Sequence, residues 1–360
     1  MIRANVKKED RQLHVGILGC SAISQAAHLR AASTARNVEL TAICDSSKDL
    51  GWKMAAIYEP KKIYPTYREM LDDPDVDAII VGVPDRFHAD SALQAVLAHK
   101  HVLVEQPMGL TVEECETLMD VGHRLHQVVQ VGSLRRFDSG IRFARDYIRK
   151  NFKNIVSFHS WLCESSDLSV VEENLQPILY SNRAAIRTLY GTDAQNILYQ
   201  QGTMMFDTAV FLCGPIREIS ARTASTGDMQ SWAITLQFES GVLGTLHLEQ
   251  NIRAERREGF EIYSSEGSIF GTCYSPWQFQ TTQVTCRLAG KNELITPYDP
   301  DGQFFRRQLE SFADVILAEK KMPQTGAGLN EGIHVLKAIL ATIESAAQNG
   351  RPVLLSEVFS

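Results

Sequence analysis

Several features that would assign this 360-residue chain to a specialised class are missing. No apolar run approaches the roughly 20 residues that a membrane-spanning helix needs, so we expect no membrane contact. The net charge of −7, without a basic stripe, argues against binding to nucleic-acid phosphates. The first residues, MIRANVKKEDRQ, lack the apolar segment of a signal peptide, so we expect a cytoplasmic protein.

The seven cysteines form no C-x-x-C pair. This spacing favours reduced, mostly buried thiols over disulfides or a zinc site. His123 and His126 lie three residues apart in a helical stretch, but no carboxylate or cysteine stands near them at metal spacing. We therefore expect no metal.

The order of local patterns predicts an N-terminal doubly wound domain over residues 1–132. Short, Val- and Ile-rich strands alternate there with helical patterns, one of them with Thr111 as N-cap and Glu114 three residues on. Such alternation is typical of a parallel sheet covered on both faces, whose ligands bind outside the carboxyl ends of the strands. The predicted strands are LHVGIL (13–18), VELTAIC (38–44), DAIIVGV (77–83), HVLVE (101–105) and QVVQVG (127–132).

The pattern changes after about Lys150, where segments such as SWAITLQFES and VLGTLHLEQN alternate polar and apolar residues. This favours an α+β domain over 133–360 with an open, mostly antiparallel sheet. Two amphipathic helices follow near the end, and the last is a candidate to pack back on the first domain. Outward-directed His247 and Glu249 on the open face suggest a subunit interface.

A cofactor signal follows the first strand, in VGILGCSAIS (15–24). A dinucleotide site favours G-x-G-x-x-G here, and this chain offers Gly19, Ser21 and Ser24, with Ala22 and Ile23 between the serines. Asp45 ends the second strand, where an acid would bind the adenosine ribose and favour NAD over NADP. The alternative is a doubly wound domain that binds no dinucleotide.

The segment VGVPDRFHADSALQAVLAHKHVLVEQPMGLTVEE resembles the core of the glucose–fructose oxidoreductase, inositol dehydrogenase and MocA (Gfo/Idh/MocA) family. The segments LRRFD (134–138), SSEGSIFG and GRPVLL also fit, so the resemblance covers nearly the whole chain. It implies a Rossmann domain, a second domain with an open sheet that commonly pairs in homodimers or homotetramers, and hydride transfer between NAD(P) and a sugar or polyol hydroxyl. The residues that it places at the cofactor are Pro84, His88, Glu105 and Gln106.

The chain departs from the family pattern at the positions of the acid/base residues. The family's Lys of Glu-Lys-Pro is Gln106 here, and the D-x-G-x-H-x-x-D pattern reads QQGTMMFD (200–207). Gln200 and Met204 thus replace an Asp and a His, and only the last acid, Asp207, remains. Because oxidation of an alcohol needs a group to take the hydroxyl proton, these changes indicate altered or lost chemistry.

Replacement groups are few, since no lysine lies between Asn154 and Gly290. Tyr199, Gln106 and Asp207 are the catalytic candidates, although Asp207 could equally be a scaffold carboxylate. Tyr180 and Tyr190 are further phenols near the altered segment. The candidate substrate contacts are Arg136, Arg183, Gln200 and Met204. Arg183 and Arg187 lie four residues apart, and the default expectation for both is a solvent-exposed helix face. For Arg136 the alternative is a structural role at the domain junction.

Three hypotheses follow. The first is an NAD(P)-dependent oxidoreductase for a small polar, sugar- or polyol-like substrate, with an unusual acid/base set. The second is a ligand-binding regulatory member without redox turnover, and the third is a lyase, isomerase or cyclase that uses the old cleft. His88 is either near the nicotinamide or a helix-packing residue, and the sequence leaves this open.

Overall fold

A computed structural model describes residues 11–165, 179, 193–318, 322 and 325–358. The chain divides into two compact units, which are described separately. The first contains the residues up to Gly132, together with Leu179 and the described part of 305–330. The second contains the remaining described residues.

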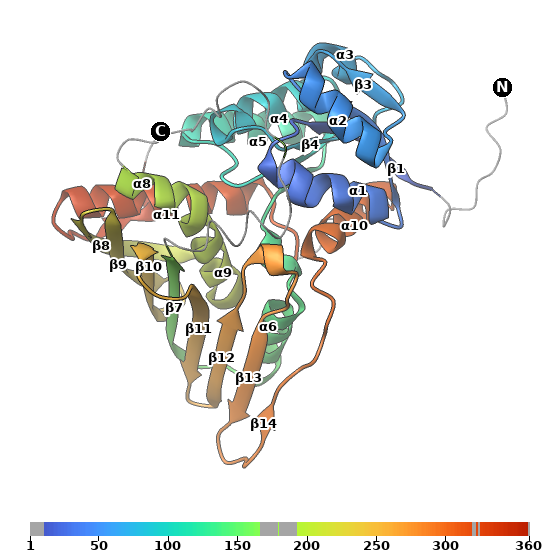
Figure 1. The fold of residues 1–360 in the computed structure, drawn as a ribbon. Coiled ribbons are helices and arrows are strands. Elements are labelled where there is room, and N and C mark those ends of the chain that lie inside the picture. The colour runs from blue at the N-terminus through green and yellow to red at the C-terminus, as the bar shows by residue number, and fades with distance from the viewer. Residues whose placement is uncertain (1–10, 166–178, 180–192, 319–321, 323–324, 359–360) are drawn as a thin grey trace. The chain divides into compact units, whose positions relative to one another are not determined.

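The first unit is built on a six-stranded parallel sheet in the order β3-β2-β1-β4-β5-β6 (Figure 1). The order reverses between β1 and β4, which is where doubly wound sheets open a crevice at the carboxyl ends of their strands. The short strand β3 was not anticipated from sequence. The strands are β1 (Leu13–Leu18), β2 (Val38–Cys44), β3 (Lys62–Tyr64), β4 (Ala78–Val81), β5 (His101–Val104) and β6 (Val129–Val131).

Helices connect these strands, and capping side chains define where several of them begin. Thr111 and Glu114 form the reciprocal capping box predicted for α5, while the Ser47 hydroxyl caps α2. The first helix is continuous, because the π-helical turn η2 leads directly into α1. The elements are η2 (Ser24–His28), α1 (Leu29–Thr34), α2 (Lys48–Tyr58), α3 (Tyr67–Leu71), η3 (Asp85–Phe87), α4 (His88–Leu97), α5 (Val112–Leu125) and α10 (Phe304–Leu317).

Helix α10 comes late in the sequence, yet almost all of it belongs to the first unit. Asn37, next to the start of β2, donates through its amide to the Glu310 carbonyl at 2.9 Å and to the Asp314 carboxylate at 2.7 Å. The backbone of Ala327 pairs with Val131 on β6. Helix α10 therefore belongs to the first unit, whereas all but the first two residues of α11 belong to the second.

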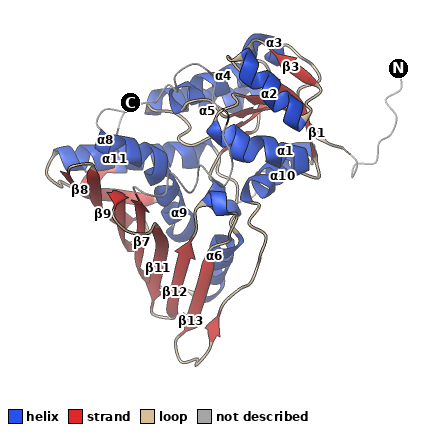
Figure 2. Cartoon of the chain, in the orientation of Figure 1, coloured by secondary structure: helices blue, strands red, loops and turns tan. Residues whose placement is uncertain are grey.

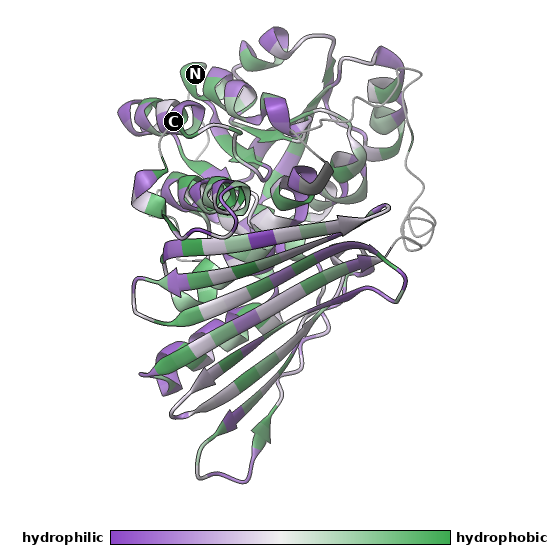
Figure 3. Ribbon diagram, turned by 90° about the vertical axis from the view of Figure 1, so that its left-hand side faces the viewer, coloured by the Kyte–Doolittle hydropathy of each residue, from purple (hydrophilic) through white to green (hydrophobic). Residues whose placement is uncertain are grey.

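The second unit is built on a nine-stranded sheet in which, among the described strands, only β7 and β10 pair in parallel. This confirms the open, mostly antiparallel sheet. Hydrophilic and hydrophobic residues alternate along its strands (Figure 3). The strands are β7 (Ile155–Ser165), β8 (Ile216–Thr226), β9 (Met229–Phe238), β10 (Leu243–Ile252), β11 (Arg257–Ser264), β12 (Gly267–Cys273), β13 (Gln283–Leu288), β14 (Leu294–Ile295) and β15 (Val353–Leu354).

Helices cover one face of this sheet (Figure 2). Helix α6 contacts β12 and β13, and α9 contacts β7, so side chains such as Phe158, Leu162 and Phe260 are buried there. None of the helices in the described ranges is long and apolar enough to cross a bilayer. The elements are η4 (Leu134–Phe137), α6 (Ser139–Asn151), α8 (Asp193–Ile197), η5 (Leu198–Gly202), α9 (Thr203–Cys213), η6 (Pro276–Gln278), α11 (Leu329–Ala347) and η7 (Leu355–Glu357).

Candidate functional site

The turn after β1 requires glycine at position 19. Gly19 has a φ of +89°, a left-handed conformation that favours glycine. A Cβ atom at this position would lie 2.8 Å from the carbonyl oxygen of Gly82, which follows β4. The turn therefore brings the start of the first helix close to the carboxyl ends of β1 and β4, where a doubly wound sheet binds its ligand.

The two serines of the incomplete fingerprint lie in different environments. Ser24 is fully buried, and its hydroxyl lies against Gly82, so this small side chain packs the first helix on the sheet. Ser21 is half-buried, and its hydroxyl lies 3.5 Å from both the backbone nitrogen and the hydroxyl of Ser24. The Ser21 hydroxyl thus faces the first turn of the helix, where Ala22 and Ile23 also lie. The N–H groups of that turn have no carbonyl partner within the helix and can bind a phosphate.

Asp45 is held at the same edge of the sheet. One of its carboxylate oxygens accepts the N–H of Cys20 at 2.6 Å, and the other accepts the N–H of Ser47 at 2.7 Å. Each oxygen keeps a second lone pair, so a ribose hydroxyl can still donate to the carboxylate. Together, the glycine turn, the helix N-terminus and the half-buried acid fit a dinucleotide.

Glu105, Gln106 and Pro107 follow β5 at this edge, and Pro84 follows β4. Glu105 and Gln106 are half-buried, and the Gln106–Pro107 peptide bond is cis. A buried residue that the sequence analysis missed, His28, lies with its Nε2 atom 2.8 Å from a Glu105 oxygen. The available signal was its position four residues after Ser24, which places both side chains on the sheet-facing side of the helix.

His88 is buried between two backbone carbonyls. Its Nδ1 atom lies 2.7 Å from the Pro107 oxygen and its Nε2 atom 2.8 Å from the Val83 oxygen. Both ring nitrogens are thus occupied by the backbone of the loops after β4 and β5. Of the two interpretations that the sequence left open, this geometry favours a structural role, in which His88 holds the loops at the cofactor edge.

Leu179 belongs to the first unit and is held there through its backbone. The Gln25 amide donates to the Leu179 carbonyl at 2.8 Å and accepts the Leu179 N–H at 2.9 Å. The same amide nitrogen donates to the Cys20 carbonyl at 2.9 Å. Gln25, which the sequence analysis did not single out, therefore connects the turn after β1 to a residue far along the chain.

The second unit pairs two of the predicted site residues with each other. Arg136 on η4 binds both oxygens of Asp207 on α9 through its Nε atom at 3.0 and 2.9 Å, and a terminal nitrogen lies 2.7 Å from one of them. Only 3% of Arg136 and 1% of Asp207 are exposed. This arrangement favours the scaffold interpretation of Asp207 over a catalytic base, because the carboxylate already has a buried cationic partner.

The remaining candidates of the second unit lie on or next to the π-helical turn η5. Tyr199 is buried, and this burial raises the pKa of its phenol, so the side chain stays protonated at neutral pH. Gln200 is exposed and Met204 is half-buried. Arg183, Arg187, Tyr180 and Tyr190 lie outside the described residues.

A chain of charged groups near η5 was not anticipated. The Arg256 guanidinium donates to Glu164 at 3.1 Å and to Glu258 at 2.6 Å. Arg135, which is 1% exposed, donates to the same Glu258 oxygen at 2.5 Å, and the Gln201 amide donates to Glu164 at 3.3 Å. Strand alternation did not reveal this cluster, because its members are brought together from β7, β11, η4 and η5 and the loop that precedes β11.

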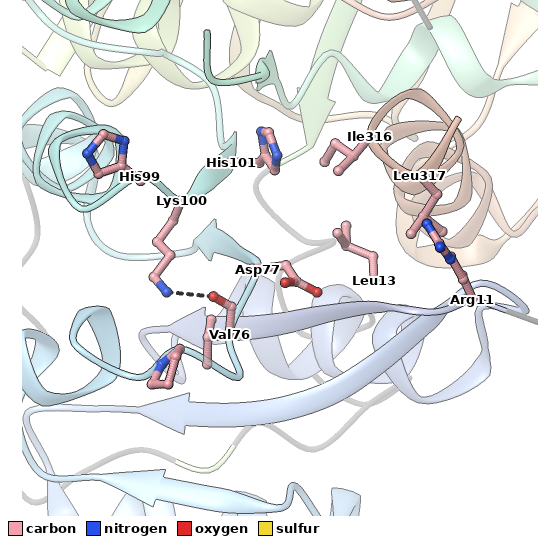
Figure 4. Close-up of a pocket in the computed structure, with 10 residues that line it drawn as sticks. Arg11, Leu13, Val76, Asp77, His99, Lys100, His101, Ile316 and Leu317 are labelled. Atoms are coloured by element: carbon pink, nitrogen blue, oxygen red, sulfur yellow. Dashed lines mark hydrogen bonds between the residues drawn. The ribbon is translucent and has the colours of Figure 1, made fainter. Parts of the chain in front are cut away.

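A cavity of about 370 Å³ lies in the first unit, at the opposite edge of the parallel sheet (Figure 4). Leu13 and His101, the first residues of β1 and β5, line it. Lys100, also in its wall, donates to the carbonyls of Asp73 and Val76 at 2.7 Å each, and burial lowers its pKa. The cavity is therefore distinct from the cofactor edge. Within the described ranges, no three His, Cys, Asp or Glu side chains are arranged to hold a metal ion.

The reversed strand order, the glycine turn and the acid after β2 define a dinucleotide-binding Rossmann unit. Family models agree: one described as "Oxidoreductase family, NAD-binding Rossmann fold" matches residues 13–133, and "GFO/IDH/MocA C-terminal domain" matches 173–270. An uncharacterised oxidoreductase, ORF334, of Rhizobium meliloti is 31% identical over 93% of this chain and 97% of its own length. The chain belongs to the Gfo/Idh/MocA family of oxidoreductases.

Two further similar proteins are named by an activity. Inositol 2-dehydrogenase of Salmonella typhimurium is 32% identical, over 36% of this chain and 39% of its own length. A solved structure of levoglucosan dehydrogenase in complex with NADH and levoglucosan has a TM-score of 0.79 and 20% identity, and the match covers 96% of this chain and all of that one. At this identity, the structural likeness supports the fold alone.

The Arg136–Asp207 pair generates a stability prediction. We expect D207N to lower the free energy of unfolding by about 3–5 kcal/mol, because it leaves a buried guanidinium without its counter-charge. The measurement is urea denaturation followed by circular dichroism. D228N is the matched control, because Asp228 pairs with Arg253 at 3.0 Å on the surface and its loss should cost no more than about 1 kcal/mol. Equal effects of the two variants would contradict the buried-pair interpretation.

Proposed function

We propose that this protein is an NAD-dependent oxidoreductase for a small polar, sugar- or polyol-like substrate, with a non-standard acid/base set. Its membership of an NAD-binding oxidoreductase family gives the class of activity. The observation that carries the proposal is the joint placement of the Gly19 turn, Asp45 and the Glu105–Gln106–Pro107 segment at one edge of the sheet. Inositol and levoglucosan, named for two relatives, set the substrate class to be tested.

Asp45 supports NAD rather than NADP. Its carboxylate is fixed by the N–H groups of Cys20 and Ser47, at the end of β2 where the adenosine ribose binds in Rossmann domains. A fixed negative charge accepts a hydrogen bond from a ribose 2′-hydroxyl. It repels a 2′-phosphate, which is why NADP binding is disfavoured.

NAD, when bound, supplies the hydride acceptor, and the protein must orient the substrate and receive a proton. Gln106 can donate and accept hydrogen bonds, so it can orient a hydroxyl or carbonyl oxygen. It cannot take a proton as the family's lysine can. Tyr199 is buried with a raised pKa, and Asp207 is bound by Arg136, so neither is a ready base. The proposal therefore includes slower proton transfer than in members that keep the lysine and histidine.

A second candidate function is a member without redox turnover. It would be either a ligand-binding regulatory protein or a lyase, isomerase or cyclase in which Gln106 polarises a carbonyl. The observation that favours it is the joint loss of titratable groups at Gln106, Gln200 and Met204. Cofactor binding and turnover separate the two candidates.

Cofactor titration is the first test. We expect saturable quenching of tryptophan fluorescence by NADH and weaker binding of NADPH. D45N removes the charge but keeps one acceptor, so it should shift the NADPH-to-NADH affinity ratio toward NADPH by about tenfold, or about 1.4 kcal/mol. D49N is the control, because Asp49 is exposed on α2 and pairs with Lys53. Failure of both nucleotides to bind at millimolar concentration would exclude the dehydrogenase proposal.

Restoring family residues tests the proposed chemical defect. Q106K alone should not produce oxidation of inositol or glucose, because Gln200 and Met204 also depart from the family pattern. The triple variant Q106K/Q200D/M204H should raise NADH formation by about 10²-fold or more, since a positioned acid/base contributes ~10²–10⁴-fold. The measurement is NADH absorbance at saturating NAD. A clear gain from the single variant would show that the other two positions matter little.

We also propose that the protein forms a homodimer or homotetramer through the open face of the C-terminal sheet. This face carries a row of aromatic rings, with His159 and Tyr263 centred 6.0 Å apart and Tyr263 and Phe270 5.9 Å apart. Tyr263 and Phe270 are 38% and 39% exposed, which is high for large apolar rings on a sheet. F270K should therefore lower the mass measured by analytical ultracentrifugation. L97K, at an exposed residue on α4 of the first unit, is the comparison, because this residue does not lie on the C-terminal sheet. A wild-type monomer would disprove the proposal.

A further inference from the structure

A buried imidazole and a carboxylate meet directly beneath the loop that carries Gln106. His28, on η2, is 2% exposed, and its Nε2 atom lies 2.8 Å from a Glu105 oxygen at the end of β5. The first helix and the end of the fifth strand supply one residue each, so only the folded sheet brings them together. The proposed function assigns no role to His28.

The carboxylate of Glu105 is confined on its other side as well. Its second oxygen accepts the Gln106 N–H at 3.3 Å. The same oxygen lies so close to Gly132 that a Cβ atom there would be only 2.8 Å away. Glu105 is thus wedged between the first helix and the end of β6, and it holds the backbone of the residue that follows it.

His28 is itself fixed. Its ring packs edge-on against Phe305 of α10, with centroids 5.7 Å apart and planes at 86°. Burying a carboxylate costs free energy unless a partner compensates its charge or completes its hydrogen bonds, so apolar side chains would fill this space at lower cost. The 2.8 Å contact with His28 instead confines the Glu105 carboxylate beside the Gln106 peptide.

His88 restrains the next residue from the other side, through its 2.7 Å contact with the Pro107 carbonyl. Two buried imidazoles therefore act on consecutive residues of one loop. His88 contacts the loop directly, whereas His28 acts on it through Glu105.

We propose that His28 is a positioning residue which, through Glu105, fixes the Gln106 peptide at the carboxyl end of β5. The second part of the proposal rests on the proposed function: this peptide forms the nicotinamide end of the cofactor cleft, so losing the restraint weakens NADH binding. Neither His28 nor Glu105 is assigned a contact with reacting atoms.

The test compares H28F with H28Q in the full-length protein. Phenylalanine keeps the ring against Phe305 but loses the Glu105 contact, whereas the glutamine amide can place an N–H near the former Nε2 position. Hydrogen exchange by mass spectrometry follows peptides spanning 101–110 without cofactor, with the β2 peptide 38–44 as internal reference. We expect about tenfold faster exchange at 101–110 in H28F, because this segment opens more readily without the Glu105 contact, and near wild-type exchange in H28Q.

NADH affinity is the second measurement. We expect the dissociation constant to rise about tenfold in H28F and to recover in H28Q, with kcat changed less than KM for NAD if a substrate is found. Unchanged exchange at 101–110 in H28F would overturn the positioning role. Faster exchange with unchanged NADH affinity would overturn the link to the nicotinamide end. If the wild type binds no nucleotide, the proposed function fails, and the exchange result still decides the positioning role.

G132A provides a second route if H28F does not fold. An added methyl group at Gly132 would lie 2.8 Å from the Glu105 carboxylate and 3.1 Å from the Glu105 Cα atom, so it displaces Glu105 while leaving the His28 side chain in the protein. It should reproduce the faster exchange at 101–110. G51A is the matched control. A Cβ atom at Gly51 on α2 would have one neighbour within 4 Å, the Asp45 Cβ atom at 3.9 Å, which is an ordinary van der Waals distance. Wild-type exchange in G132A would count against the proposal.

Discussion

The cofactor edge depends on one constraint, the close approach of Gly19, which follows β1, to Gly82, which follows β4. A side chain at Gly19 would collide with the Gly82 carbonyl, and Gly82 in turn receives the Ser24 side chain. This contact sets where the first helix begins, and so places Ser21, Ala22 and Ile23 at the carboxyl edge of the sheet. Asp45 then reaches the Cys20 N–H, and His28 reaches Glu105.

The second unit uses charge in a different way. Several of its buried and half-buried arginines and acids engage one another, in the Arg136–Asp207 pair and in the chain from Arg135 through Glu258 and Arg256 to Glu164. Buried pairs of this kind fix the arrangement of elements, because breaking either partner leaves an uncompensated charge. They leave little free acid or base for catalysis among the family positions. Within the described part of the chain, Asp207 is engaged by Arg136 and Tyr199 is buried, so neither is a ready base.

These two features together describe an oxidoreductase-family protein with a built cofactor edge and a second unit in which Asp207 is already paired. Three side chains restrain the backbone at the cofactor edge. Glu105 and His88 contact the loop that carries Gln106, and His28 contacts Glu105. The restraint acts on the backbone, and the side-chain amide that this backbone carries can orient a polar group but cannot exchange a proton. The chemistry of this site therefore depends on what binds opposite Gln106.

The sequence by itself determined the local elements and the family. The strands LHVGIL and VELTAIC lie where their patterns predicted, and Thr111 caps α5, because apolar periodicity and capping depend on residues near in sequence. The cofactor motif also follows from local spacing.

Only the tertiary structure decided which side chains meet. It paired His28 with Glu105 and Arg136 with Asp207, enclosed His88 between two carbonyls, and assigned α10 to the first unit. Local patterns cannot specify these contacts, because each depends on the register and packing of elements that are far apart along the chain. The same packing determines which polar groups remain available for chemistry.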